Sequence, residues 1–111
     1  MAAKHLTRLR RICLALPEAH EVETWGESTF RVGEKMFAVA APDGSSMSCK
    51  ATKEDQAELV ASRPHVSVAH YVGRFGWVSV KLAEADWGEV EELVRDSYRL
   101  IAPKRLAKLL D

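Results

Sequence analysis

The residues of this chain that could do chemistry are concentrated in two short signatures. Each signature combines a tryptophan, a glycine turn and isolated cations, in Trp25-Gly26 with Phe30-Arg31-Val32 and in Arg74-Phe75-Gly76-Trp77. Cationic side chains can contact phosphates, and indole rings can stack on unpaired bases. The signatures therefore predict a recognition surface. Its candidate nucleic-acid-binding residues are Trp25, Arg31, Lys35, Lys50, Arg74, Trp77 and Lys81.

Some of these residues also suggest a small-ligand pocket between a sheet and the C-terminal segment. Its candidate lining is Trp25, Arg31, Tyr98 and Lys104, which together could bind a small anion. Glycine-rich phosphate loops, nucleophile elbows and HExxH motifs are absent from the sequence. The four histidines are scattered without the spacing of metal ligands. We therefore expect a non-enzymatic protein with neither a metal nor a cofactor.

The composition indicates one ordinary globular domain that covers residues 1–111. The chain is 47% hydrophobic and 29% charged, and its formal net charge is zero. A neutral chain has no overall basic field, which disfavours strong non-specific binding of nucleic acid. The charges are nevertheless segregated, because residues 1–16 contain only basic and residues 84–96 mostly acidic charges. This segregation leaves open a role as a protein-partner or homodimerisation module.

The cysteines and the apolar segments bear on localisation. Cys13 and Cys49 are too few for a disulfide framework, and their apolar neighbours predict buried thiols. The sequence shows no signal-peptide pattern and no apolar run near the ~20 residues of a membrane span. We therefore expect a cytoplasmic protein that does not enter a membrane.

Apolar residues at helical spacing predict the helices that must position the signatures. Leu6, Leu9, Cys13 and Leu16 define an amphipathic first helix that Pro17 ends. Thr52 begins a second helix as its N-cap, and Asp86-Trp87-Gly88-Glu89 is a capping box for a third. Pro103 favours the start of a short final helix.

The remaining segments alternate with the period of two that is typical of strands. The predicted strands are residues 20–25, 29–32, 35–41, 46–50, 66–72 and 77–82, with turns at Val32-Gly33-Glu34-Lys35 and Pro42-Asp43-Gly44. Alternation places Trp77, Ser79 and Lys81 on one side of the sheet, and it places Trp25 on the same side as Glu21 and Glu23. Hairpin connections imply antiparallel pairing. The fold class is therefore α+β, a two-layer sandwich with helices on one sheet face, in the order α-β-β-β-β-α-β-β-α-α.

The order of these signatures resembles the MmcQ/YjbR family of small bacterial proteins. The resemblance is carried by Leu16-Pro17 with Glu21, Trp25-Gly26, Phe30-Arg31-Val32, Lys35-Met36-Phe37-Ala38, Gly76-Trp77-Val78, and Ser97-Tyr98 through Ala102-Pro103-Lys104. It implies a frataxin-like or secretion-chaperone-like α+β sandwich and a DNA-binding role through a double-wing arrangement of hairpins. Arg74 is the one cation in the loop before Trp77, where some relatives have a more basic stretch.

Overall fold

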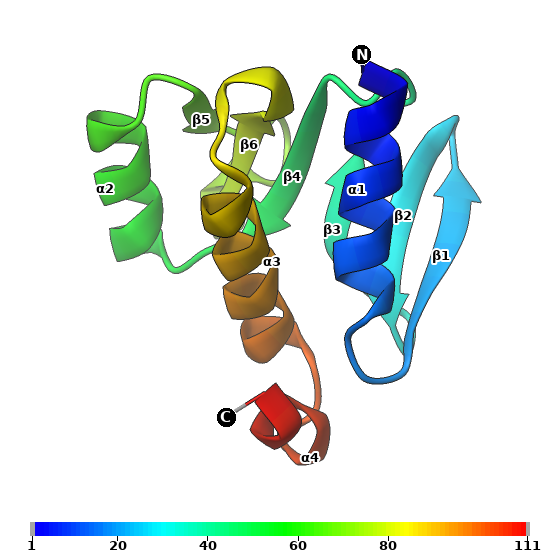
Figure 1. Cartoon of the computed structure of the whole chain (residues 1–111). Coiled ribbons are helices and arrows are strands. Elements are labelled where there is room, and N and C mark those ends of the chain that lie inside the picture. Colours follow the sequence, from blue (N-terminus) through cyan, green and yellow to red (C-terminus); the bar gives the residue numbers. More distant parts are fainter. Residues whose placement is uncertain (1, 111) are drawn as a thin grey trace.

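The computed structural model describes residues 2–110 and consists of one antiparallel sheet with helices packed against it (Figure 1). The strands are β1 (Ala19–Thr24), β2 (Glu27–Val32), β3 (Lys35–Ala40), β4 (Ser46–Lys50), β5 (Val66–Val68) and β6 (Trp77–Lys81). The α-helices are α1 (Ala2–Leu14), α2 (Lys53–Ser62), α3 (Trp87–Ile101) and α4 (Lys104–Ala107). Short 3-10 helices are η1 (Gly73–Phe75), η2 (Leu82–Glu84) and η3 (Lys108–Leu110).

The six strands lie in the order β1-β2-β3-β4-β6-β5, and every neighbouring pair is antiparallel. Helices α1 and α3 lie side by side across one face of this sheet, and α2 packs near the β5 edge (Figure 1). The predicted fold class, its element order and its one-sided helical layer are confirmed. The opposite face of the sheet has no helix over it in the described part of the chain.

The capping residues predicted from the sequence begin two of the helices. Thr52 Oγ1 accepts a hydrogen bond of 3.0 Å from the backbone N–H of Asp55 at the start of α2. The Asp86 carboxylate accepts one of 3.1 Å from the N–H of Glu89 at the start of α3. Both bonds satisfy amide groups that have no partner within their own helix. Local sequence therefore determines where these helices begin.

One strand is shorter than predicted. The segment 66–72 was expected to be extended throughout, but β5 ends at Val68 and is followed by a loop and by η1. The reason is backbone conformation, because Tyr71 has a φ of 63° and cannot continue a strand. The side chain of buried Gln56 secures the loop by donating hydrogen bonds to the carbonyl oxygens of Gly73 (2.7 Å) and Trp77 (2.8 Å).

The hydrophobic core lies between the helices and the covered sheet face. Val78 and Val80 of β6 point into it, together with Phe30 and Phe37 from β2 and β3. Tyr98 of α3 packs edge-on against Phe37 with ring centroids 5.3 Å apart. Strand alternation then directs the intervening side chains to the open face, where the candidate site lies.

A bulge lets strand β3 supply two successive residues to the core. Phe30 pairs with Ala38 while the next residue, Arg31, pairs with Met36, so Phe37 is the extra residue on β3. Phe37 and Ala38 are both fully buried on the helical side. The bulge keeps Arg31 and Met36 on the open face, where both line the same hollow.

Candidate recognition site on the open sheet face

A hollow of about 690 Å³ occupies the sheet face that the helices leave open. Its floor consists mainly of outward-facing strand residues, many of which carry hydroxyl groups. Its rims come from the β1–β2 turn and from the loop after β5. The lining residues are Thr24, Trp25, Glu27, Thr29, Arg31, Met36, Val39, Ser46, Ser48, Ser67, Val68, Ala69, His70, Tyr71, Val72, Trp77 and Ser79. A space of this size is in the range of ligand sites.

Two almost fully exposed aromatic rings stand on the rims of this hollow. Trp25 and Tyr71 are each 96% exposed, although both have large apolar rings that normally become buried. Their φ angles are 53° and 63°, in the left-handed region that non-glycine residues rarely adopt. Strained conformations of this kind are concentrated at functional sites. The hollow is therefore the strongest candidate site in the described residues.

The Trp25 conformation follows from a two-residue hairpin turn. Strand β1 ends at Thr24 and β2 begins at Glu27, so Trp25 and Gly26 alone connect them. Both have positive φ, as the primed hairpin turns with two left-handed central residues require. Asparagine followed by glycine is the usual sequence there, and tryptophan in the first position is unusual. The turn therefore presents the indole to solvent at the cost of backbone strain.

The turn conformation also corrects the predicted side for Trp25. Alternation placed it with Glu21 and Glu23, but Trp25 lies in the turn and lines the open-face hollow with Thr24. Glu21 points to the helical face, where its carboxylate accepts hydrogen bonds of 2.7 and 3.0 Å from Arg10 of α1. The hydrogen bond from Arg10 lowers the pKa of Glu21. This carboxylate therefore does not repel an anion in the hollow.

Arg31 is held in place in the hollow by neighbouring oxygen atoms. Its Nε donates to Thr29 Oγ1 (3.0 Å), one Nη to the carbonyl oxygen of Glu34 (3.0 Å), and the other to Thr24 Oγ1 (3.4 Å). Thr29, which is 2% exposed, in turn donates its hydroxyl proton to the carbonyl of Val22 at 2.6 Å. These bonds use three of the five guanidinium N–H groups. Each terminal nitrogen thus retains one N–H group that can donate to a ligand.

Trp77 closes the floor of the hollow from β6. Trp77 is only 7% exposed. It nevertheless lies on the opposite side of the sheet from Val78 and Val80, as alternation predicted. Ser79 lies on the same side and also lines the hollow. Trp77 therefore contributes a largely buried side chain to the floor of the site, whereas Trp25 and Tyr71 lie at its rims.

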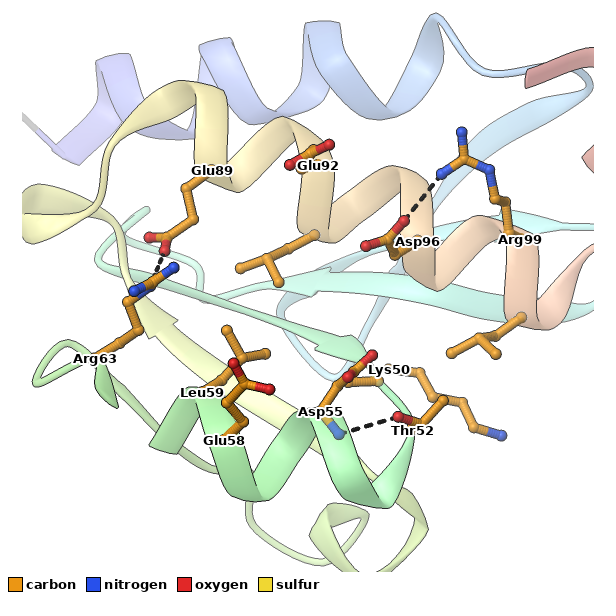
Figure 2. Close-up of a pocket in the computed structure, with 13 residues that line it drawn as sticks. Lys50, Thr52, Asp55, Glu58, Leu59, Arg63, Glu89, Glu92, Asp96 and Arg99 are labelled. Carbon is orange, nitrogen blue, oxygen red and sulfur yellow. Dashed lines mark hydrogen bonds and ion pairs between the residues drawn. The ribbon is translucent and has the colours of Figure 1, made fainter. Parts of the chain in front are cut away.

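The structure brings together only some of the residues that the sequence nominated for nucleic-acid binding. Trp25, Arg31 and Trp77 line the hollow, whereas the other four cations do not. Lys35 and Lys81 are exposed at strand ends. Lys50 lines a separate groove between α2 and α3 (Figure 2). The guanidinium of Arg74 lies 4.9 Å from the centroid of its neighbour Phe75.

The proposed four-residue anion pocket does not form as predicted. Trp25 and Arg31 share the hollow, but Tyr98 is fully buried on the helical side of the sheet. The Tyr98 hydroxyl donates a 2.6 Å hydrogen bond to the carbonyl of Pro17, and burial raises its pKa. Lys104 is exposed at the start of α4 and is not among the residues that line the hollow. The Tyr98 ring packs in the hydrophobic core against Phe37, and its hydroxyl is hydrogen-bonded to the carbonyl of Pro17.

Tyr71 is the site residue that sequence reasoning did not identify. It lay inside a segment predicted to be a strand, where an aromatic residue is ordinary. The one available signal was its position two residues before Gly73, close to the end of the apolar alternation. Its exposure depends on the conformation of the loop, which tertiary contacts from Gln56 help to determine.

Two further features of the described residues concern metals and membranes. Within residues 2–110, His, Cys, Asp and Glu side chains nowhere gather in groups of three that could hold a metal ion. None of the helices in the same range combines the length and apolar character needed to cross a bilayer.

Comparisons with known proteins place this geometry in a family. The fold is similar to the crystal structure of the Deinococcus radiodurans protein DR2400, described by its DUF419 domain, with a TM-score of 0.82 and 26% identity. That match covers 95% of this chain and 86% of the other. No curated protein matches the chain. The family model described as YjbR matches residues 14–100. This range includes all six strands, both tryptophan signatures and most of α3. This chain therefore belongs to the YjbR family.

Proposed function

We propose that this protein binds DNA through the open face of its sheet, and that it takes single-stranded rather than duplex DNA. The observation that carries the proposal is the pair of 96% exposed rings, Trp25 and Tyr71, at the rims of one hollow. Exposed aromatic rings beside a groove are a common platform on which successive bases stack. Duplex bases are already stacked on one another and are not available to such rings.

The position of the rings favours an extended ligand over a compact one. Trp25 follows the edge strand β1, and Tyr71 follows β5, the edge strand at the other side of the sheet. A ligand that contacts both rings must therefore cross the sheet, as a flexible polymer strand can. Between the rims, Arg31 has two further N–H donors for a phosphate, and the serine hydroxyls offer additional hydrogen bonds.

The charge of the hollow also favours stacking over electrostatic attraction. Among its lining residues the charged side chains are Arg31 and Glu27, and His70 can add a charge only when protonated. Such a site neutralises few phosphates, so its affinity must depend on the aromatic rings. This distinguishes the proposal from general binding to a basic protein surface, which a chain of zero net charge does not provide.

Fluorescence anisotropy with labelled oligonucleotides tests the proposal. At ~50 mM salt, where electrostatic contributions are strongest, we expect a single strand to bind and the duplex of the same sequence to bind at least about ten-fold more weakly. A preference for the duplex would contradict the single-strand assignment. The absence of binding to either form at this salt concentration would reject DNA binding altogether.

Aromatic substitutions locate the binding surface. Trp25→Ala and Tyr71→Ala should each weaken single-strand binding by about ten-fold, since one base–aromatic stack contributes about 1–3 kcal/mol. Phe75→Ala is the matched control, because Phe75 is 55% exposed but does not line the hollow. Equal losses from all three variants would show that exposed aromatic area in general, and not this hollow, determines binding.

A further inference from the structure

A second hollow of about 510 Å³ runs between α2 and α3, on the side of the molecule away from the open sheet face (Figure 2). Both helices contribute side chains to its walls, and the segment Lys50–Thr52 closes one end. This groove shares no lining residue with the hollow that contains Trp25 and Arg31. It is therefore a separate surface that the proposed DNA site does not use.

The two helices present the same residue pattern to the groove. In each, two acids and a leucine occur at positions i, i+3 and i+4, which lie on one face of a helix. Each leucine is partly buried against the core and contributes to the floor, and the carboxylates form the walls. The matching residues are Asp55, Glu58 and Leu59 on α2 and Glu89, Glu92 and Leu93 on α3.

The apolar floor continues along α3. Leu100 lies further along the same helix, lines the groove and is 46% exposed. With Leu59 and Leu93 it makes a line of leucines open to solvent. A ligand that covered them would remove apolar surface from water, which is favourable in proportion to the buried area.

The lining of the groove has an excess of negative charge, because five carboxylates face three cations, Lys50, Arg63 and Arg99. Arg63 forms an ion pair with Glu89, and Arg99 forms one with Asp96 (Figure 2). Within residues 2–110, Glu58 and Glu92 have no ion-pair partner, although they come from the two opposite helices. Like charges on facing walls disfavour the free protein and favour a cationic ligand.

We infer that this groove binds a cationic amphipathic helix from another protein, with leucine-like side chains on one face and Lys or Arg beside them. The leucine line would accept the apolar face, and the unpaired carboxylates of Glu58 and Glu92 would contact the flanking cations. An amphipathic helix in an apolar groove is a recurrent mode of peptide recognition. The acidic walls would repel nucleic acid, so this surface and the DNA site have opposite preferences.

A second copy of the chain is the less favourable occupant. The basic stripe on α1 comprises Lys4, Arg8 and Arg11. The guanidinium of Arg8 is already engaged, since it lies 4.8 Å from the centroid of the Trp87 ring. Docking this stripe into the groove of a neighbour would have to disrupt that contact. We therefore assign the groove to a different protein.

The test uses a labelled peptide of about 20 residues, because isolated helices shorter than ~12–15 residues are marginal in water, with Leu at i, i+3, i+4 and i+7, Lys beside this apolar face and Ala elsewhere. A scrambled peptide of the same composition has the same charge but no apolar face. We expect the patterned peptide to bind the full chain, and the scrambled peptide to bind about ten-fold more weakly. Equal binding of the two peptides would overturn the inference, as would no binding of the patterned peptide at ~50 mM salt.

Two charge variants localise the binding. The double variant Glu58→Gln with Glu92→Gln should weaken peptide binding about ten-fold, because it removes the carboxylates that contact the peptide's cations. It should not lower the melting temperature, because these carboxylates have no ion-pair partners to lose in the described part of the chain. Glu23→Gln with Glu84→Gln changes the net charge equally at exposed positions that line neither hollow, and it should bind like the parent. Equal binding by both double variants would refute the groove assignment.

A third variant and a measurement of self-association complete the test. Leu100→Gln removes apolar surface at the exposed end of the floor without adding a charge or opening the core, and it should also weaken binding. Unchanged binding by this variant would refute the assignment independently of the glutamates. Sedimentation that showed a concentration-dependent dimer, abolished by Glu58→Gln with Glu92→Gln, would assign the groove to a second copy and overturn the inference.

Discussion

Trp25 and Tyr71 lie on turns next to the two opposite edge strands of the sheet, and their side chains line the same hollow on its open face. Both residues combine 96% exposure with a left-handed backbone. Each property has an energetic cost. An exposed ring contributes no hydrophobic stabilisation, and a left-handed φ strains any residue that has a Cβ. The presence of two such residues at one site supports the proposed role of this hollow in binding.

Replacing Trp25 by asparagine should stabilise the protein while it weakens DNA binding. Asparagine tolerates the left-handed conformation of the first turn position, and the following Gly26 is already the preferred partner. We expect Trp25→Asn to raise the unfolding free energy by about 1 kcal/mol and to weaken single-stranded DNA binding about ten-fold. Thermal melts and anisotropy measure the two effects. A variant with lower stability and unchanged affinity would contradict the role given to this side chain.

Arg31 should determine most of the salt dependence of binding. For single strands, the logarithm of affinity falls with the logarithm of salt by about 0.7 per neutralised phosphate. Arg31→Gln should therefore make this slope shallower by about 0.7, while Arg31→Lys, which keeps the charge, should retain it. Anisotropy titrations over a range of salt concentrations measure the slopes. An unchanged slope for Arg31→Gln would place phosphate contacts outside the hollow.

Ser97 should contribute strongly to stability, because its hydroxyl group joins two strands. The Oγ accepts a 2.9 Å hydrogen bond from the Lys50 N–H and donates one of 2.6 Å to the carbonyl of Phe37. These groups lie just beyond the last paired residues of β3 and β4, so Ser97→Ala leaves both unsatisfied. We expect a loss of about 1–3 kcal/mol in urea unfolding. Exposed Ser62→Ala is the control and should be nearly neutral; comparable losses would disprove the bridging role.

The ion pair between Arg10 and Glu21 should make stability depend on acid pH. The hydrogen bond from Arg10 lowers the native pKa of Glu21 below its ordinary 4.5. Stability from this carboxylate is therefore present above about pH 4.5 and is lost as pH falls through the native pKa.

Because the pair is partly exposed, Glu21→Gln should cost only about 0.5 kcal/mol at pH 7, and the difference from the parent should be smaller at pH 3. Urea unfolding at the two pH values measures this, with exposed Glu23→Gln as the control. A cost that persisted unchanged at the lower pH would show that the loss does not come from the carboxylate charge.

Gly76 of the second signature should tolerate replacement less well than Gly33 of the β2–β3 turn. It has a φ of 98°, and a Cβ there would lie 2.1 Å from the carbonyl oxygen of Ala51. Gly33 has a φ of 61°, but a Cβ added there would meet no atom within 4 Å. The variant Gly33→Ala therefore tests conformational strain alone. Gly76→Ala should cost about 2 kcal/mol more than Gly33→Ala in urea unfolding. Equal costs would show that the loop moves away from Ala51 without penalty.

The sequence by itself determined the features of this protein that depend on local periodicity and capping. Helical and strand spacing predicted the core sides of α1 and β6, and the hydroxyl of Thr52 and the carboxylate of Asp86 predicted the starts of α2 and α3. These signals act over a few residues, and the structure keeps them because the core satisfies the same pattern. The same signals predicted the order of the elements, which the structure confirms, and the resemblance to the MmcQ/YjbR family is confirmed by the YjbR match.

Only the tertiary structure decided which side chains share a surface. The alternation along residues 66–72 did not indicate that Tyr71 would be exposed, because its backbone lies in a loop that Gln56 of α2 secures. The sequence placed Lys50 and Arg31 on strands as candidate contacts for one nucleic acid. In the structure, Lys50 lines the α2–α3 groove and Arg31 lines the hollow on the open face. Such groupings depend on contacts between residues far apart in the chain, and alternation along a single strand contains no information about them.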